Sequence, residues 1–260
     1  MDLLSAIFLG LIQGLTEFLP ISSSGHLVLT QHLLGYAGSH LAFDLLVHLG
    51  TLLAVVIYFR RDIAQIFSSA IAGSGEVDGR RWIAMIALGT VPTAVIGYAF
   101  RDQFEAFFGQ PRLVSLMLWL TAILLFFSDR IRLKAQSGQR LTIPRALLVG
   151  TAQGLAIIPG ISRSGSTIAT GIFSGLNPDK AARFSFLLSV PAIFGASLLE
   201  FNHISGLTSQ NLLPYLAGTA IAFLSGYLAI DVLLKMVVKR RLWKFSIYLL
   251  VVGLIGLILT

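Results

Sequence analysis

A short polar segment occurs twice in this chain, at matching positions of two halves. Residues 21–25 read ISSSG and residues 161–165 read ISRSG, and a Gln-Gly-Leu precedes each of them, at 13–15 and 153–155. The offset is 140 in both cases, since 153 − 13 and 161 − 21 give the same number. Polar interruptions at corresponding positions of two apolar halves indicate a duplicated membrane protein with a site buried between its repeats.

Composition places the chain in a membrane. Apolar residues make up 55% of it and charged residues only 12%, whereas a soluble domain carries about 25% charge. The absence of cysteine excludes disulfides, thiolate metal sites and cysteine nucleophiles. The net charge of +7 would indicate nucleic acid in a soluble protein, but here most Lys and Arg residues lie in short loops. We therefore attribute the charge to membrane topology and anionic lipid, and expect no nucleic acid partner.

Six segments have the length and apolarity of a membrane-spanning helix, which needs about 20 residues. Two other apolar stretches, 3–36 and 144–176, are interrupted at 20–25 and at 159–165, each time by proline, serine and glycine. Because proline lacks an N–H donor and glycine permits positive φ, we expect each stretch to form a re-entrant helical hairpin and not a continuous span. The six predicted spans are 41–59, 81–100, 112–128, 181–201, 212–234 and 245–259.

The distribution of Lys and Arg predicts the orientation of the chain. If both hairpins return to the side from which they enter, 16 of the 19 Lys and Arg residues fall in loops on one face. Only Arg101 and Arg112 fall on the other face, and Arg163 lies inside. The positive-inside rule makes the first face cytoplasmic. Its loops are 60–81, 129–145, 177–183 and 235–244, of which we expect the two longest, 60–81 and 129–145, to be ordinary loops.

The predicted fold is an all-α integral membrane protein with an inverted-topology repeat, six transmembrane spans and two re-entrant helical hairpins. It forms a single membrane domain over 1–260, with one repeat at about 1–128 and the other at about 144–259. Each repeat holds one hairpin and three spans, so the two have opposite orientations and their polar tips can meet near the bilayer midplane. The glycine pairs Gly10/Gly14 and Gly150/Gly154 would let helices pack closely there.

Glu17 is the first candidate for chemistry, because a carboxylate at membrane depth costs about 2.5–3.5 kcal/mol or more unless it is paired. Gln13 lies one turn earlier, on the same helix face. Together they offer oxygen ligands for a hard divalent cation, Mg²⁺ or Ca²⁺. The alternative is that Glu17 only pairs with Arg163 for structure.

The first polar loop is predicted to be an anion cradle. Its hydroxyls, its backbone N–H groups and the start of a helix from about His26 would surround a negative group. Helix capping must account for one of the three serines. His26 is a candidate base near neutral pH, with a satisfied packing residue as the alternative. The loop residues concerned are Ser22, Ser23, Ser24, Gly25 and His26.

The second polar loop carries Arg163, the single arginine predicted deep in the membrane. Its planar guanidinium suits a bidentate grip on phosphate oxygens. A structural role as counter-ion to Glu17 is compatible with this function. Around it lie Ser166 and the candidate binding residues Gly160, Ser162, Ser164, Gly165 and Thr167. Asp44 and His48 share another helix face, four residues apart, and we expect both to be interfacial.

This set of groups favours hydrolysis of a lipid phosphate. Arginine and helix N-termini indicate an anionic, phosphate-bearing substrate, whereas a carboxylate with metal and histidine indicates its hydrolysis. A site at the midplane indicates that the substrate is itself a lipid. A flippase or transporter of the lipid phosphate is the alternative, because inverted repeats with a midplane site are typical of transporters. A channel is disfavoured, since the polar residues cluster and do not line a path.

Two motifs resemble a known family. Gln13-x-x-x-Glu17, followed by FLPISSSGH at 18–26, resembles the first signature of the undecaprenyl-diphosphate phosphatases, the bacitracin-resistance family. PGISRSGST at 159–167 is similar to the second signature. The resemblance covers the whole chain, and two such motifs together are highly specific. It departs at Gln13, where some members have a second Glu, which weakens any two-carboxylate metal site.

The resemblance implies removal of the terminal phosphate from the C55 isoprenoid diphosphate carrier, which is thereby recycled for peptidoglycan synthesis. It implies a divalent metal, a location in the bacterial inner membrane with an active site facing the periplasm, and bacitracin as a competitor for the lipid. Glu17 would be the metal-linked carboxylate, Arg163 the diphosphate clamp, His26 the base or nucleophile and Ser23 a candidate nucleophile. Water as the nucleophile and a homodimer as the oligomeric state stay open.

Overall fold

The computed structural model describes residues 1–33, 41–73, 78–131, 140–199 and 209–260, and these ranges are all-helical, with no strand. The helices of the first half are α1 (Leu3–Phe18), α2 (Ser23–Leu33), α3 (Leu41–Tyr58), α4 (Arg60–Ala72), α5 (Gly79–Ala99), α6 (Arg101–Phe108) and α7 (Pro111–Ser128). Those of the second half are α8 (Ile143–Leu155), α9 (Arg163–Phe173), α10 (Pro178–Leu199), α11 (Ser209–Val238) and α12 (Trp243–Leu259).

The chain is a multi-pass membrane protein. Four helices, α5, α7, α10 and α11, are long and apolar enough to cross a bilayer, and α3 with α4 adds a fifth if this pair, bent by 63°, counts as one span. α12 covers the sixth predicted span but has only 17 residues. The predicted all-α membrane class is therefore confirmed, whereas the exact number of six spans stays a prediction.

The sequence predicted an ordinary loop over 60–81. This prediction is wrong, because residues 60–72 form α4. The helix buries Ile66 while its arginines are exposed, and such one-sided burial lets a polar sequence form a helix against the bundle. It ends at Gly73, whose left-handed φ of 66° allows its N–H to donate to the Ser69 carbonyl. A second short helix, α6, is also absent from the prediction and buries Phe104 in the same way.

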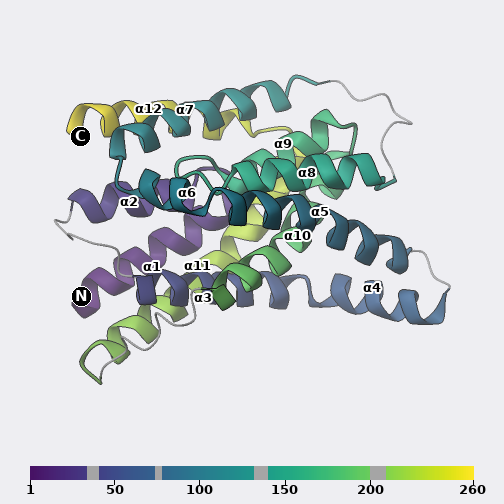
Figure 1. The fold of residues 1–260 in the computed structure, drawn as a ribbon, viewed down its shortest axis with the longest axis horizontal. Coiled ribbons are helices and arrows are strands. Elements are labelled where there is room, and N and C mark those ends of the chain that lie inside the picture. The colour runs from purple at the N-terminus through teal and green to yellow at the C-terminus, as the bar shows by residue number, and fades with distance from the viewer. Residues whose placement is uncertain (34–40, 74–77, 132–139, 200–208) are drawn as a thin grey trace.

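Both predicted breaks are present, and each separates two short helices that contact one another. α1 and α2 are joined through residues 19–22, and α8 and α9 through 156–162. In Figure 1 the outer ends of α1 and α2 lie at the left, whereas those of α8 and α9 lie at the right. The two breaks thus lie between the ends of the molecule. α2 begins at Ser23 and not near His26 as predicted, because the serine side chains of this loop satisfy its first turn.

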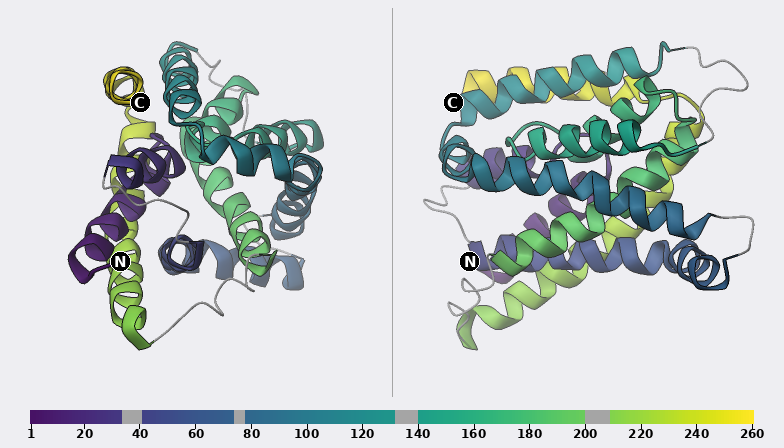
Figure 2. Two further views of the ribbon diagram at one scale, coloured as in Figure 1. Left: turned by 60° about the vertical axis from the view of Figure 1, so that its left-hand side comes forward. Right: turned by 45° about the vertical axis from the view of Figure 1, so that its right-hand side comes forward.

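Close contacts between glycines position the two broken helices. α1 packs along α11, where a Cβ added to Gly10 would lie 2.2 Å from the Gly218 carbonyl oxygen. α8 packs along α5 in the same manner, and a Cβ on Gly150 would lie 1.9 Å from the Gly89 carbonyl oxygen. The expectation that these glycines allow close helix packing is confirmed. On the outer side, α7 lies beside α12, as both views of Figure 2 show.

The interior is unusually polar and the outside apolar, as a membrane protein requires. Buried serine, threonine and glutamine side chains line the helices around the two breaks, whereas large apolar side chains such as Leu4, Tyr98 and Ile258 are mostly exposed. Next to the first break, the rings of Phe18 and Phe59 pack on Phe186, with centroids 5.8 and 5.4 Å away. This aromatic cluster supports the end of α1 that carries Glu17.

Candidate active site

Each break is followed by a helix whose first turn is capped by a serine. The Ser22 hydroxyl accepts a hydrogen bond from the Gly25 N–H at 3.2 Å, and the Ser162 hydroxyl accepts one from the Gly165 N–H at 3.1 Å. The two caps are 140 residues apart, like the sequence motif. Ser22 has a φ of 69°, a conformation that costs a non-glycine residue energy and that clusters at functional sites.

The two loops touch. A Cβ on Gly25 would lie 3.1 Å from the Gly160 Cα, and a Cβ on Gly165 would lie 3.3 Å from the Pro20 Cβ. The Ser164 hydroxyl also donates to the Leu19 carbonyl at 3.3 Å, which links the second loop to the first. The glycines at these points leave room for the opposite loop, so that two segments 140 residues apart in sequence form one polar centre.

Glu17 is the hub of this centre. Its carboxylate is buried, with 7% of the residue exposed. One oxygen, Oε2, accepts hydrogen bonds from the Gln13 amide at 3.0 Å and from the Ser23 hydroxyl. The other, Oε1, accepts one from the Arg163 guanidinium and forms an ion pair with it. Three candidate residues from two halves of the chain thus meet at the carboxylate of a fourth, which is paired as a buried charge must be.

His48 also belongs to this centre, although the sequence indicated an interfacial position. Its Nε2 lies 3.8 Å from Glu17 Oε2, and its Nδ1 lies 2.7 Å from the Asp44 carbonyl oxygen. Asp44 itself accepts a hydrogen bond from Gln31 at 3.1 Å. The one signal available from sequence was the spacing of four residues between Asp44 and His48, which puts both on one helix face but does not say which neighbour that face meets.

His26 lies apart from the carboxylate. Its Nδ1 is 2.8 Å from the Ser22 carbonyl oxygen and its Nε2 is 2.9 Å from the Tyr248 hydroxyl of α12, with the two rings stacked 5.6 Å apart. In the described part of the chain, no hydrogen bond or ion pair joins His26 to Glu17 or Ser23. Tyr248 gave no signal in the sequence, because its partner is more than 200 residues away.

The remaining predicted residues mainly make hydrogen bonds that hold the two loops together. Ser24 lies 3.4 Å from Ser22, and Ser162 lies 3.2 Å from Ser164, hydroxyl to hydroxyl. Thr167 is fully buried and binds the Arg163 carbonyl at 2.7 Å and the Ser185 hydroxyl at 2.5 Å, so that it ties α9 to α10. Ser166 is also buried.

Thr121 of α7 holds the second loop from outside. Its hydroxyl oxygen accepts a hydrogen bond from the Ser162 N–H at 3.0 Å and lies 3.2 Å from the Gly160 carbonyl oxygen. Gly160 itself has a φ of 94°, and a Cβ there would lie 2.3 Å from the Val114 carbonyl oxygen. The loop before Arg163 therefore approaches α7 so closely that only glycine fits, and Thr121 fixes its position.

The described residues offer few metal ligands. No group of three or more His, Asp or Glu side chains among them could enclose an ion. The Gln13 Oε1 atom, however, is buried and has no hydrogen-bond partner in the described part of the chain, so it is free to bind a cation. Since Mg²⁺ is usually held by one or two carboxylates together with substrate phosphates and water, Glu17 and Gln13 fit an ion that the substrate helps to bind.

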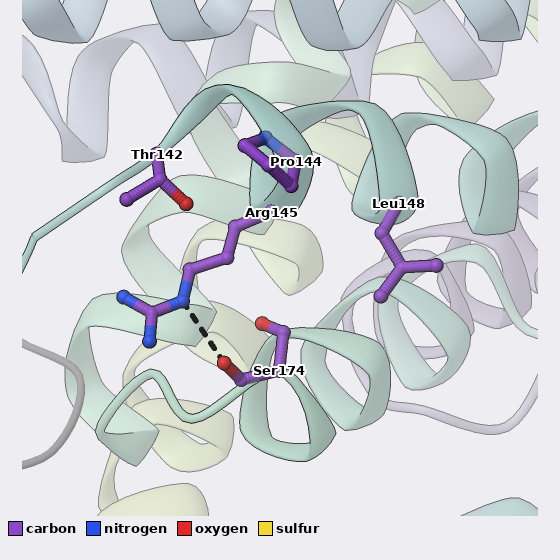
Figure 3. A pocket seen from close by; sticks show the side chains of 5 residues that line it. All are labelled: Thr142, Pro144, Arg145, Leu148 and Ser174. Carbon is purple, nitrogen blue, oxygen red and sulfur yellow. Dashed lines mark hydrogen bonds between the residues drawn. The ribbon is translucent and has the colours of Figure 1, made fainter.

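A separate pocket of about 360 Å³ lies away from this centre. Figure 3 shows it between the start of α8 and the end of α9, where Arg145 donates to the Ser174 carbonyl at 2.9 Å. Its lining residues are Thr142, Pro144, Arg145, Leu148 and Ser174. It contains none of the residues that meet at Glu17, and we assign it no part in the chemistry.

The arrangement at Glu17 suits chemistry on a phosphate. A hydroxyl donates to a buried carboxylate, which can therefore take its proton, and a guanidinium beside them can bind anionic oxygens. The helices α2 and α9 both begin at the two loops that touch here, and the N–H groups of Gly25 and Gly165 in their first turns donate to the capping serines. A soluble phosphatase could use the same groups, but here they lie inside a helical membrane protein.

Comparison with known proteins agrees with this chemistry. The profile of the family described as "Bacitracin resistance protein BacA" matches residues 6–255. A protein of Syntrophotalea carbinolica named Undecaprenyl-diphosphatase is 46% identical over 255 residues, which is 97% of each chain. Proteins of the same name from Geobacter sulfurreducens and Halothermothrix orenii are each 44% identical, over 97% and 100% of this chain and 96% and 98% of their own. The chain therefore belongs to the bacitracin resistance protein BacA family.

Proposed function

We propose that this chain hydrolyses undecaprenyl diphosphate to undecaprenyl phosphate and inorganic phosphate. The observation that carries the proposal is the buried carboxylate of Glu17, bound by a serine of one loop and an arginine of the other inside a membrane protein. Relatives named for this hydrolysis match nearly the whole chain, which favours a hydrolase over a carrier. The product, undecaprenyl phosphate, would return to peptidoglycan synthesis as the lipid carrier. Because bacitracin would compete for the diphosphate form of the lipid, its hydrolysis would give resistance to bacitracin.

The fold proposed for this function is an inverted repeat of six spans and two re-entrant hairpins. Reciprocal contacts support it: Gly25 meets Gly160 while Gly165 meets Pro20, and each pair becomes the other when 140 is added to or subtracted from its numbers. The pairing of α1 with α11 matches that of α8 with α5. The opposite directions of the two broken helix pairs in Figure 1 agree with this symmetry.

We place the site on the periplasmic side of the inner membrane, with the charged loops in the cytoplasm. The support is the excess of Lys and Arg in 60–81, 129–145, 177–183 and 235–244. The helix α4, which forms most of the described part of the first of these segments, lies toward the right-hand end of Figure 1. A reporter fused after Thr260 that is active only outside the cytoplasm tests this; activity only inside would contradict it.

In the proposed reaction Arg163 grips the diphosphate, because its planar guanidinium can bind two phosphate oxygens at once. It is partly accessible, with 20% of its side chain exposed, although it is paired with Glu17. The N–H groups at the starts of α2 and α9, with Ser24 and Ser164 beside them, would surround the same oxygens. Substrate binding would then exchange part of the contact between Arg163 and Glu17 for contacts to phosphate.

Ser23 is the best placed of the three candidate nucleophiles, because its hydroxyl already donates to Glu17. Its oxygen would bond to the terminal phosphorus while the bond from that phosphorus to the bridging oxygen breaks. Glu17 takes the hydroxyl proton, and undecaprenyl phosphate leaves. Water then cleaves the phosphoserine and releases inorganic phosphate. His26, whose two ring nitrogens lie at Ser22 and Tyr248, would hold the loop that carries Ser23.

A divalent cation, Mg²⁺ or Ca²⁺, fits beside these groups. Glu17 would hold it together with the unpaired amide oxygen of Gln13. When bound, such an ion would neutralise negative charge on the diphosphate.

A phosphate-release assay tests the proposed function. Purified protein in detergent, undecaprenyl diphosphate and Mg²⁺ should yield inorganic phosphate and undecaprenyl phosphate in equal amounts. Vesicles with the same protein and a labelled lipid phosphate separate hydrolysis from transport. Lipid movement between leaflets without phosphate release would overturn the hydrolase in favour of the carrier.

A further inference from the structure

His48 is held with one particular nitrogen toward Glu17. Its Nδ1 lies 2.7 Å from the Asp44 carbonyl oxygen, and since a carbonyl can only accept, Nδ1 must carry the hydrogen. In the neutral ring Nε2 therefore presents a lone pair, and this atom lies 3.8 Å from Glu17 Oε2. Two electron-rich atoms thus face each other across a gap in a partly buried site, where 31% of the His48 side chain is exposed.

A cation between the two atoms would make this arrangement favourable. Glu17 already has a full positive charge at its other oxygen, from Arg163, and two neutral donors at Oε2. The contact of Nδ1 with a backbone carbonyl is the arrangement that fixes the tautomer of metal-binding histidines and directs Nε2 at the ion. Two ligands of one small divalent ion lie about 3.0–3.4 Å apart when each bond is about 2.1 Å, so the gap of 3.8 Å needs to close only slightly.

We infer that His48 Nε2 is a ligand of the divalent ion at Glu17, and that this nitrogen makes the site prefer Mn²⁺ over Mg²⁺ or Ca²⁺. The inference rests on the metal site of the proposed function and goes beyond it by adding a ligand and a metal preference. Imidazole suits first-row transition ions, whereas Mg²⁺ and Ca²⁺ favour sites made of oxygen alone. Mn²⁺ also binds carboxylate and phosphate oxygens, as a site shared with a diphosphate requires.

Gln13 would complete the protein's part of the site. Its Nε2 now faces Glu17 and its Oε1 is buried without a partner in the described part of the chain. A half-turn of the amide would exchange the two atoms and bring the oxygen to the side of the carboxylate. One carboxylate, one amide and one imidazole are then the protein ligands, and the substrate supplies the others.

Manganese binding to the purified full-length protein in detergent, without lipid, tests the inference directly. Electron spin resonance of bound Mn²⁺ should show coupling to a ¹⁴N nucleus, and His48→Ala should remove this coupling. Mn²⁺ affinity should fall by about tenfold or more in that variant, since loss of even an outer-shell partner costs about 10–100-fold. The matched control is His32→Ala, which removes an exposed histidine of α2 and should leave both signals unchanged.

His48→Gln guards against a variant that fails to fold. Glutamine keeps a polar side chain and offers an oxygen, so the ratio of Mn²⁺ to Mg²⁺ affinity should fall while the melting temperature stays near that of the wild type. Unchanged ¹⁴N coupling and Mn²⁺ affinity in both His48 variants would overturn the inference and leave His48 as an ion-pair partner of Glu17. Phosphate release is measured separately. If the wild-type protein releases phosphate but shows no ¹⁴N coupling, His48 is not a metal ligand and the proposed hydrolysis stands. If it shows the coupling but releases no phosphate, the proposed hydrolysis is wrong and the assignment of His48 as a ligand stands.

Discussion

Replacing Glu17 by glutamine tests the centre of the proposed site. The carboxylate accepts hydrogen bonds from Gln13, Ser23 and Arg163, and it is almost fully buried. Glutamine has the same shape, but one of its two terminal atoms is a donor and cannot accept. The variant therefore loses the group that takes the Ser23 proton and the negative partner of Arg163, while the volume of the side chain is kept.

The expected loss of turnover is large and the loss of stability smaller. A positioned base contributes typically about 10²–10⁴-fold to the chemical step, and a loss of 10²-fold corresponds to about 2.7 kcal/mol. Breaking a fully buried ion pair costs about 3–5 kcal/mol of folding free energy. Here the cost should be lower, because the Arg163 side chain is 20% exposed and water can reach it. We expect Glu17→Gln to be folded and nearly inactive.

The assay is phosphate release from undecaprenyl diphosphate, with thermal unfolding in detergent as a measure of folding. Glu105→Gln is the matched control, because it makes the same substitution in a carboxylate that is 63% exposed and pairs with Arg101 at 2.7 Å on the surface of α6. That variant should keep its activity. Near-normal turnover of folded Glu17→Gln would refute the role of this carboxylate.

Four further substitutions address the loops and the packing. Arg163→Lys keeps the charge but not the planar fork, so both KM and kcat should worsen; a change confined to kcat would argue against the clamp. Ser23→Ala should abolish nearly all turnover if the serine attacks phosphorus, whereas loss of a single hydrogen bond costs only about tenfold. His26→Ala should lower kcat with little effect on KM, because the loop that carries Ser23 loses its support. The effects of Ser23→Ala and His26→Ala should then not multiply, and effects that do multiply would contradict this positioning role. Gly150→Ala puts a methyl group into the α5 backbone and should destabilise the protein by about 1–3 kcal/mol in thermal unfolding, whereas Gly195→Ala, with no atom within 4 Å of its added Cβ, should not.

The two polar segments share a sequence pattern but not a set of reactive groups. Gln153 occupies in α8 the place of Gln13 in α1, and its Nε2 donates to Thr93 at 3.2 Å while its Oε1 is likewise buried and unpaired in the described part of the chain. One turn later, the counterpart of Glu17 is Ile157. At this position the second polar segment therefore has no carboxylate to bind a metal or take a proton. It contributes Arg163 instead, so that one asymmetric site forms at a nearly symmetric contact.

Much of the candidate site could be predicted from the sequence because its residues lie in two short motifs. Polar groups are costly in a membrane and stand out against an apolar background, so Glu17, Ser23 and Arg163 were visible as candidates. Their meeting was expected from the repeated motif, since two equivalent loops of opposite orientation could come together near the bilayer midplane. Helix breaks at 19–22 and 156–162 followed from proline and glycine, whose effect on the backbone is local.

The sequence by itself thus determined the membrane class, the two helix breaks and several of the residues around Glu17, because composition, short motifs and backbone breaks are properties of neighbouring residues. Only the tertiary structure brought His48 to Glu17 and Tyr248 to His26, and it alone placed Thr121 against the loop before Arg163. These contacts join helices far apart in the chain, and which face of an apolar helix meets which neighbour depends on how all the helices pack. The folding of 60–72 into α4 belongs to the same class, since burial of Ile66 against the bundle decides it.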